Sequence, residues 1–246
     1  MPQKAIMPNP HVRKLSSFVR LSDADQIWLA EAVGSSQQLP ARADLIEEGD
    51  DPRAVNVILD GWACRYRQLN DGRRQIVSLI LPGDACDPHV FLLDRMDHAI
   101  GALTSVTFAQ ISGSTMRELC ARSPTLDDAF HREALATTAI QREWAVSLGR
   151  RSGAERLAHL LCELHARLTA VGLAETSSCP MLMTQLDLAD ALGQSGVHVN
   201  RSLQELRGQG LITLKSRRLT IHDPKGLAEI AHFDPIYLHF TQAASR

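Results

Sequence analysis

Short runs of apolar residues, separated by turn residues, fill the first half of the chain from residue 37 to about residue 113. The turns include Asp60-Gly61, Asn70-Asp71-Gly72 and Pro82-Gly83-Asp84. Asp-Gly and Asn-Asp-Gly sequences accept the positive φ angles that tight hairpin turns need. The pattern therefore predicts antiparallel strands that form a small β-barrel or jelly roll. The expected strands cover residues 55–59, 62–69, 73–81, 99–105 and 107–112.

Apolar residues at helical spacing flank this region on both sides. Residues 11–35 predict a short helical lead-in, and helical character returns at about residue 115. Between Pro124 and Gly149, neither proline nor glycine interrupts a long helix that reaches Arg151. A near-heptad stripe on this helix can pack on the chain's own barrel or on a second copy of itself, and the spacing leaves both open. The stripe includes Phe130, Ala134, Thr137, Gln141, Trp144 and Leu148.

A capping box starts the next predicted helix. The side chains of Ser152 and Glu155 can each bind a free backbone N–H group at the other's position. Leucines at helical spacing continue this helix to about Val171. The segment from Gly149 to Gly153 is therefore the expected hinge and the boundary between two domains.

Residues 184–212, which read TQLDLADALGQSGVHVNRSLQELRGQGLI, predict two short helices joined by a tight turn. Thr184 and Asp187 form a second capping box at the start of the first helix. Gly193 suits the left-handed residue that ends a helix, and Ser195 is a favoured N-cap for the next one.

The second of these helices has two faces of different chemistry. Val199, Leu203 and Leu206 share one side and are expected to be buried. An amide, a guanidinium and a small apolar group on the other side suit base edges in a DNA major groove. The outward residues are Val197, Asn200, Arg201 and Gln204. The pattern predicts a helix-turn-helix; the alternative is an ordinary helical hairpin in which Arg201 pairs with Glu205.

A basic hairpin follows directly. Two short β-like runs in TLKSRRLTIHD flank a tip that carries Lys215, Arg217 and Arg218, as expected of a wing that contacts phosphates. From Ser195 to His222 there are five basic residues and one acidic residue, although the whole chain has a net charge of −2. This local excess of positive charge supports binding to a nucleic acid.

Composition narrows the class of protein. The chain has 246 residues, of which 44% are hydrophobic, so it can form two domains with sizeable cores. It has no apolar run long enough for a transmembrane helix, and its first residues lack the apolar core of a secretory signal. Five scattered cysteines without a CxxC motif suit a reduced, cytoplasmic setting. The chain contains no nucleophile elbow, P-loop or HExxH motif, so we do not expect an enzyme.

With these parts in order, the chain resembles the Crp/Fnr family of bacterial transcription regulators over nearly its full length. The motifs that carry the resemblance are GRRSGAERLAHLLCELHARL at 149–168, the helix-turn-helix segment, the turns VILDGWACRYR and LPGD, and a terminal FDPIYLHF. The resemblance implies an α+β protein with an N-terminal antiparallel β-roll, a long central dimerisation helix and a C-terminal winged helix-turn-helix. The implied domains are a sensor roll at 1–122, a dimerisation helix with the hinge at 123–151, and a DNA-binding domain at 152–246.

The family's functional positions can be carried over to this chain. The recognition helix starts at Ser195, and the wing supplies phosphate contacts. The resemblance implies a homodimer on a two-fold symmetric DNA operator, joined through the long helix, with RNA polymerase as a further partner. The base-facing sites are Gly196, Val197, Asn200 and Arg201, while Thr184, Gln185 and His198 match contacts to the DNA backbone.

The chain also departs from the family's pattern. Val197 replaces a glutamate that reads cytosine, so the usual half-site does not carry over whole. Asp97-His98-Ala99 stands where cyclic-AMP binders carry an Arg-Ser/Thr-Ala segment, so we do not expect cyclic AMP to bind. No cysteine precedes Cys64, so we do not expect an iron–sulfur cluster.

Three alternatives remain open at this stage. Cys86, His89 and His98 could attract a metal or haem, although Cys is more often a small buried residue, and we predict no cofactor. Cys179 could be a redox-sensitive thiol rather than a linker residue. DNA binding could also be gated by a small-molecule, redox or metal effector at the β-roll. A cupin-like enzyme is disfavoured, because the barrel offers only His89 and His98 as imidazole ligands.

Overall fold

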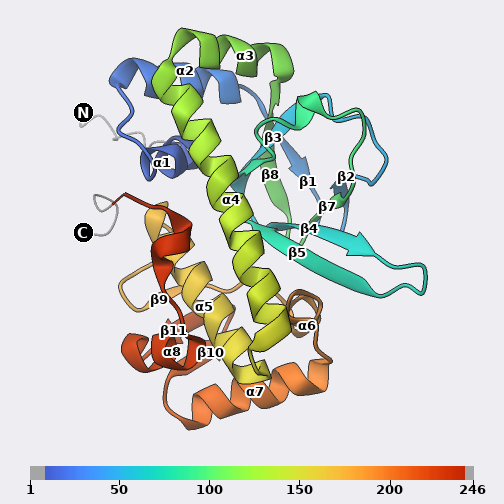
Figure 1. Ribbon diagram of the computed structural model, residues 1–246, viewed down its shortest axis with the longest axis vertical. Helices are drawn as coiled ribbons and strands as arrows, with labels where there is room; N and C mark the ends of the chain where they lie inside the picture. Colours follow the sequence, from blue (N-terminus) through green and yellow to red (C-terminus); the bar gives the residue numbers. More distant parts are fainter. Residues whose placement is uncertain (1–8, 242–246) are drawn as a thin grey trace.

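The computed structural model describes residues 9–241 and has a β-roll at one end, a helical domain at the other and a long helix alongside both (Figure 1). The fold is α+β, as predicted. Within the described residues, none of the helices has the length and hydropathy to cross a membrane.

Two four-stranded antiparallel sheets make up the β-roll. One has the order β1 (Ser36–Leu39), β8 (Val106–Ser112), β3 (Ala54–Asp60) and β6 (Ala85–Cys86). The other has the order β2 (Asp44–Ile46), β7 (Ala99–Ala102), β4 (Ala63–Gln68) and β5 (Arg74–Ile80). The strands expected from the apolar runs are therefore present, and β1, β2 and β6 are additional.

Two of the predicted turns need glycine. Gly61 has a φ of +78°, and a Cβ atom there would lie 2.1 Å from the Ser105 carbonyl oxygen. Gly83 has a φ of +99°, and its Cβ would lie 2.6 Å from the Pro10 carbonyl oxygen. Any side chain at either position would force the backbone apart.

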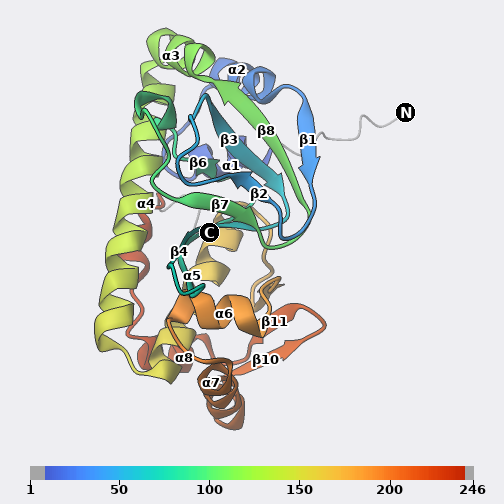
Figure 2. The ribbon, with the colours of Figure 1, turned by 90° about the vertical axis from the view of Figure 1, so that its right-hand side faces the viewer.

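Short helices pack against the roll. They are α1 (Pro10–Ser16), α2 (Asp23–Val33), α3 (Gly113–Arg122) and the 3-10 turn η1 (Val90–Leu92). Among them, α2 and α3 lie at the end away from the C-terminal domain (Figure 2). The predicted lead-in is thus two helices, because Ser22 starts α2 with a capping box to Asp25. Leu15, Phe18 and Leu29 from this layer are buried in the core of the roll.

The long helix α4 (Pro124–Arg150) runs alongside both ends of the molecule, and its outward face is uncovered (Figures 1 and 2). Phe130 and Trp144 point inward and are 0% and 7% exposed. This placement corrects the expectation that both residues contact a second chain, because they already belong to this chain's core. Ala134 and Thr137 are half-buried, and Gln141 and Leu148 are exposed at the edge of the helix.

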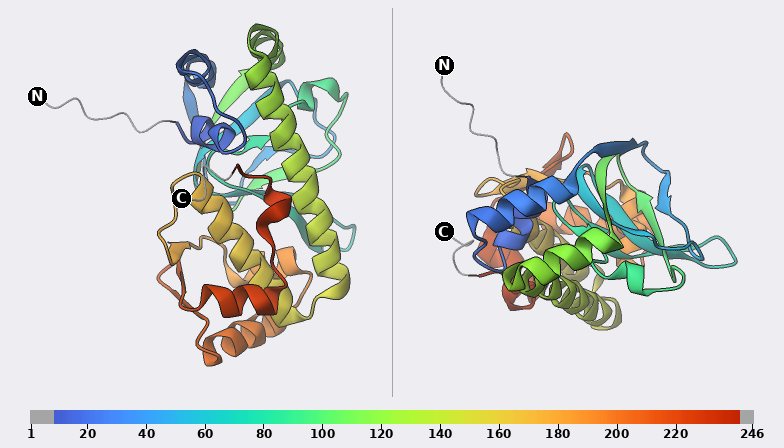
Figure 3. Two further views of the ribbon diagram at one scale, coloured as in Figure 1. Left: turned by 60° about the vertical axis from the view of Figure 1, so that its left-hand side comes forward. Right: turned by 90° about the horizontal axis from the view of Figure 1, so that it is seen from above.

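The C-terminal domain packs around α5 (Gly153–Ala170), which begins after the two-residue link Arg151-Ser152 at the expected hinge. It contains α6 (Gln185–Leu192), α7 (Gly196–Gly208), α8 (Pro224–Ala231) and the 3-10 turn η2 (Pro235–Leu238). A three-stranded sheet has the order β10 (Ile212–Lys215), β11 (Arg218–Ile221) and β9 (Ser178–Pro180). Figure 3 shows that the last described residues, which follow η2, return toward α1.

A chain of buried ion pairs joins α5 to the β-roll. Arg167 on α5 lies 2.7 Å from Asp84 of the roll and 3.1 Å from Glu163. Lys14 of α1 lies 2.8 Å from the other oxygen of Asp84. Glu163 also accepts hydrogen bonds from Trp144 Nε1 and the Tyr237 hydroxyl, each at 3.0 Å. Buried charges of this kind are tolerated only when they are paired, so the two ends of the molecule are held in a defined relation.

Candidate nucleic-acid interface

The two helices of the predicted helix-turn-helix are α6 and α7. The Gly193 residue that ends α6 has a φ of +60° and a ψ of 41°, which is the left-handed conformation expected there. Ser195 caps α7 by accepting a hydrogen bond from the His198 N–H at 3.3 Å, and its hydroxyl also lies 2.9 Å from His198 Nδ1. Val199, Leu203 and Leu206 are buried, as their spacing predicts.

The outward face of α7 is open to solvent. Val197 is 71% exposed, and Arg201 has no ion-pair partner within residues 9–241. The Arg201–Glu205 pair of the helical-hairpin alternative is therefore not formed in this structure. All of the predicted base-facing positions are exposed together on one face: Gly196, Val197, Asn200, Arg201 and Gln204.

The start of α6 offers backbone and amide donors beside α7. Thr184 and Gln185 are both exposed. However, the Thr184 hydroxyl and N–H both donate to the Asp187 carboxylate, at 2.7 and 2.8 Å. Gln185 is thus the freer of the two predicted phosphate contacts.

The wing is formed by β10 and β11, and it has the predicted basic tip. Ser216 and Arg217 occupy the turn with φ angles of 51° and 58°, and Lys215 faces Arg218 across the hairpin. Arg217 donates to the Leu182 carbonyl at 3.4 Å. Arg218 forms an ion pair with Glu175 and donates to the Ser178 hydroxyl at 2.9 Å. Glu175 lies outside residues 195–222, so the excess of basic residues in that segment does not include this acid. The unpaired positive charge at the tip of the wing is therefore smaller than the sequence indicates.

Polar side chains pair with one another around Asp97-His98-Ala99, the segment that matches the phosphate-binding segment of cyclic-AMP binders. Arg65 lies 3.0 Å from Asp87, and His98 lies 3.3 Å from Asp87 and 2.8 Å from Asp97. Although burial disfavours the imidazolium, hydrogen bonds to these two carboxylates hold the pKa of His98 above its usual value. The cations here are already paired with carboxylates, which would also repel a phosphate. The residues present do not fit a cyclic phosphate.

The thiol and imidazole groups singled out in the sequence do not converge. Within the described residues, no group of three His, Cys, Asp or Glu side chains could hold a metal ion. Cys86 is buried, and the His89 ring lies 5.1 Å from that of His131. Cys179 is also buried, and burial raises the pKa of its thiol to about 11, which disfavours the reactive thiolate.

Arg42 and Arg74 of the β-roll contact α6, and no pattern in the sequence predicts these contacts. Both bind Asp187, which is 145 and 113 residues away along the chain. Neither belongs to a local motif, so spacing could not reveal them.

Comparison with known proteins identifies both halves of the chain. Residues 155–230 match the model of the Crp-like helix-turn-helix domain, and residues 36–123 match that of the cyclic nucleotide-binding domain. The chain is 28% identical to the nitrogen fixation regulation protein FixK of Bradyrhizobium diazoefficiens over 232 residues, covering 92% of this chain and 96% of that protein. It is 26% identical to the transcriptional activator protein FnrL of Cereibacter sphaeroides, covering 81% of each.

A solved structure shows the same fold. FixK2 from Bradyrhizobium japonicum superposes with a TM-score of 0.69 at 22% sequence identity, covering 80% of this chain and 96% of that one. Both family models, the full-length relatives and this fold agree with the resemblance that the motifs indicate. The chain belongs to the Crp/Fnr family of transcription regulators.

Proposed function

We propose that this chain is a homodimeric transcription regulator that binds a two-fold symmetric DNA operator. The observation that carries the proposal is the open face of α7, where Asn200, Arg201 and Gln204 are exposed beside an exposed Val197. In this proposal residues 1–122 form the sensor part, residues 123–151 form the dimerisation helix and residues 152–246 bind DNA.

Each exposed group on this face has a matching partner on DNA. A guanidinium pairs bidentately with guanine, an amide pairs with adenine, and Val197 can contact a thymine methyl group. In this proposal the surrounding groups contact the phosphates and fix the position of the protein rather than read bases. These are Thr184, Gln185, Ser195, His198, Lys215, Arg217 and Arg218.

A second copy would cover the outward face of α4. Leu135 and Val146 on that face are 63% and 50% exposed, and Leu148 at its edge is 37% exposed. Burying these apolar side chains against their symmetry mates would stabilise the dimer. The dimer would present two α7 helices to half-sites about 34 Å apart, which is one turn of DNA.

Selection of DNA sequences by the purified protein tests this function. We expect a palindromic site with half-sites about 10 bp apart, centre to centre. Recovery of random sequences only, or of a single asymmetric element, would contradict the proposal. RNA polymerase is the expected partner in activation, and transcription in a purified system from a promoter carrying the selected site tests that contact.

Gating by an effector is the second candidate for how the regulator works. The buried Asp84–Arg167 pair favours it, because a ligand that rearranged the roll would act directly on α5. Operator affinity measured with and without cell extract distinguishes gating from control by abundance. The Arg65–Asp87–His98 contacts argue against a cyclic nucleotide as that effector.

A further inference from the structure

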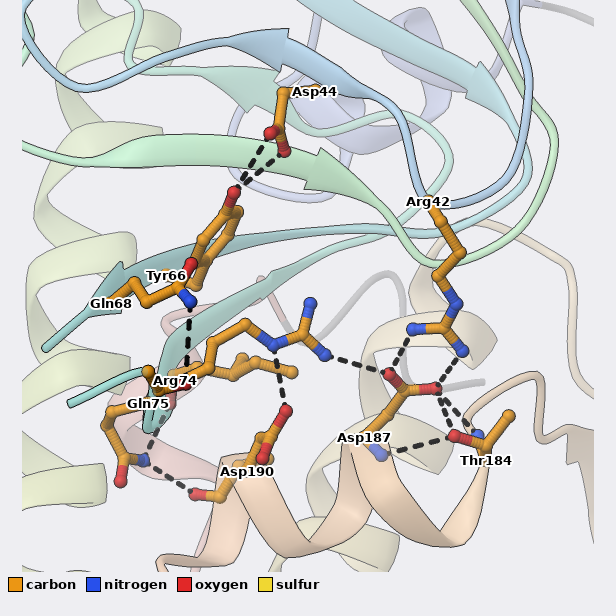
Figure 4. A network of polar contacts seen from close by, with 12 residues as sticks. Arg42, Asp44, Tyr66, Gln68, Arg74, Gln75, Thr184, Asp187 and Asp190 are labelled. Carbon is orange, nitrogen blue, oxygen red and sulfur yellow. Dashed lines mark hydrogen bonds and ion pairs between the residues drawn. The ribbon is translucent and has the colours of Figure 1, made fainter. Parts of the chain in front are cut away.

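We propose that Arg42 and Arg74 are positioning residues for DNA binding, which fix the helix-turn-helix to the β-roll and so set the orientation of α7 relative to α4. The inference rests on the proposed function, because it concerns how two α7 helices reach one operator. We refer to Arg42, Arg74, Asp187 and Asp190 as the α6 clamp. Figure 4 shows these four residues between the roll and α6.

The clamp consists of two guanidinium groups and two carboxylates. Arg42 binds Asp187 with both terminal nitrogens, at 2.6 and 3.0 Å. Arg74 bridges the two acids, lying 2.8 Å from Asp190 and 3.2 Å from Asp187. Bidentate, charge-assisted contacts of this kind fix the relative orientation of the two side chains and also stabilise their association.

Asp187 joins the clamp to the start of α6. Its carboxylate is fully buried, and it is also the capping-box residue that binds Thr184. Although burial disfavours the carboxylate, its bonds to Arg42 and Thr184 hold the pKa of Asp187 below the usual range. One carboxylate therefore fixes both the first turn of α6 and its attachment to the roll.

Arg74 is itself held in place by the roll. Its guanidinium lies over the Tyr66 ring, 5.4 Å from the ring centre, and the Tyr66 hydroxyl donates to Asp44 at 2.9 Å. Beside it, Gln75 donates to the Ala191 carbonyl of α6 at 3.3 Å. The clamp is thus supported from both sides, unlike a pair of freely mobile surface side chains.

The clamp leaves the recognition surface uncovered. The outward residues of α7 are exposed while Arg42 and Arg74 of the roll are bound to Asp187 and Asp190 of α6. The contacts therefore do not block DNA. They hold α6, and with it α7, in one orientation.

The hairpin of β4 and β5, which carries Arg74 and Gln75, also reaches the interior of the roll. Strands β4 and β5 carry Arg65 and Ser78 at their inner part, where Arg65 donates to Ser78 at 3.3 Å. They carry Arg74 and Gln75 toward the tip, beyond a register shift between Arg65 and Tyr66. The hairpin that holds Arg74 against α6 is thus the same one that carries Arg65 inside the roll.

The test compares Arg74→Ala with Arg73→Ala on two DNA molecules. Arg73 is the adjacent residue, but within residues 9–241 its side chain pairs only with the exposed Asp71. A single half-site needs one α7 helix, whereas the full operator needs two in a fixed relation. We expect Arg74→Ala to weaken full-operator binding at least about fivefold, which is the lower range of typical coupling between sites. Half-site affinity should stay within about twofold of wild type, and Arg73→Ala should resemble wild type on both.

Three results would overturn the inference. Arg74→Ala could leave both affinities unchanged, or it could lower both equally, which would make Arg74 a DNA contact or a general stabiliser. Arg73→Ala could also reproduce the selective loss. Arg74→Lys, which keeps a cation beside Asp187 and Asp190, should recover part of the full-operator affinity if the contact itself is responsible.

Hydrogen exchange of the DNA-free dimer separates this inference from the proposed function. Arg74→Ala should speed exchange in α6 and at the β4–β5 tip, while α8 keeps wild-type protection. Wild-type protein that binds no symmetric operator would refute the proposed function. Unchanged exchange in α6 would refute the clamp, whatever the DNA result.

Discussion

Arg201 projects from the middle of α7 with no acidic side chain paired to it within residues 9–241. A guanidinium in this position loses no existing ion pair when it meets DNA, so its two parallel N–H groups are available for guanine O6 and N7. The physical setting of this residue thus favours reading a base over stabilising the helix.

Replacing Arg201 with alanine tests this role. We expect Arg201→Ala to cost about 1–3 kcal/mol in operator binding and to relax specificity at one base pair per half-site. Binding to random DNA should change little. The measurement is the affinity for the selected operator and for random DNA across a salt series, and an equal loss on both would make Arg201 a phosphate contact.

The wing residue Arg217 should behave differently. It is exposed at the turn and, among the residues that the structure describes, its side chain donates only to the Leu182 carbonyl, which leaves an edge of its guanidinium open near the tip. We expect Arg217→Ala to weaken all DNA sequences alike and to flatten the salt dependence by about one counterion per lost phosphate contact. A loss confined to the selected operator would contradict this assignment.

Glu133 gives a prediction about pH. Its Oε1 atom accepts a 3.0 Å hydrogen bond from the Ala85 N–H, whereas the buried Oε2 has no hydrogen-bond partner in the described part of the chain. Burial raises the pKa of this carboxyl from 4.5 to about 8. Because the folded state binds the proton more tightly, the stabilisation from this group is complete below about pH 4.5 and is lost as the pH rises to about 8.

Glu133→Gln should remove this dependence, because the amide stays neutral and keeps the acceptor for Ala85. We expect the variant to melt close to wild type at about pH 5 and above wild type at about pH 8. Thermal unfolding of both proteins at the two pH values is the measurement. The same difference in melting temperature at both would show that Glu133 does not titrate in this way.

At the scale of elements, α4 has apolar side chains on two faces. Its inner face, with Phe130 and Trp144, packs in the chain's own core. Leu135 and Val146 are eleven positions apart, about three turns, so they lie on one line along the outer face. In the proposed dimer this outer line, rather than Phe130 and Trp144, would meet the second copy.

We expect the double variant Leu135→Asp/Val146→Asp to be a monomer that unfolds at nearly the wild-type temperature. Phe130→Ala should instead cost about 3–5 kcal/mol in the free energy of unfolding, because it opens a cavity in the core. Analytical ultracentrifugation and thermal unfolding distinguish the two effects. A stable dimer of the double variant would show that α4 does not form the interface through this face.

The elements that could be predicted from the sequence are those specified by neighbouring residues. Thr184 and Asp187, or Gly193 and Ser195, lie within a few residues of each other, and caps and turns depend on such local chemistry. The inner and outer faces of α4 could not be told apart, because both carry apolar residues and tertiary packing decides which is buried. Arg42, Arg74 and Glu175 were missed for the same reason, since their partners lie far along the chain.

At the scale of the whole molecule, the roll and the DNA-binding part share a buried network. We therefore expect a ligand in the roll to change the affinity for DNA only if its binding displaces ion pairs that the roll already contains. For cyclic AMP those pairs would include Arg65–Asp87 and His98–Asp87.

We therefore expect cyclic AMP to leave the melting temperature and the operator affinity unchanged. A ligand that binds the folded state raises its stability by mass action, so the absence of a shift at saturating nucleotide is informative. Calorimetry and operator titration with and without the nucleotide provide the measurement. Binding at physiological concentrations together with tighter operator affinity would prove the expectation wrong.

The return of the C-terminal segment to α1 has a consequence for synthesis of the protein. The Thr241 N–H donates to the Ser17 carbonyl at 2.8 Å, and the Phe240 ring lies 5.7 Å from that of Phe18. Ser17 and Thr241 are separated by 224 residues, which a ribosome adds in about 10–45 s. During that interval α1 has left the ribosome but its apolar partner does not yet exist. The C-terminal end of α1 is thus completed by residues translated more than 200 positions later, and a nascent chain that stalls before them carries an open site that chaperones and proteases can recognise.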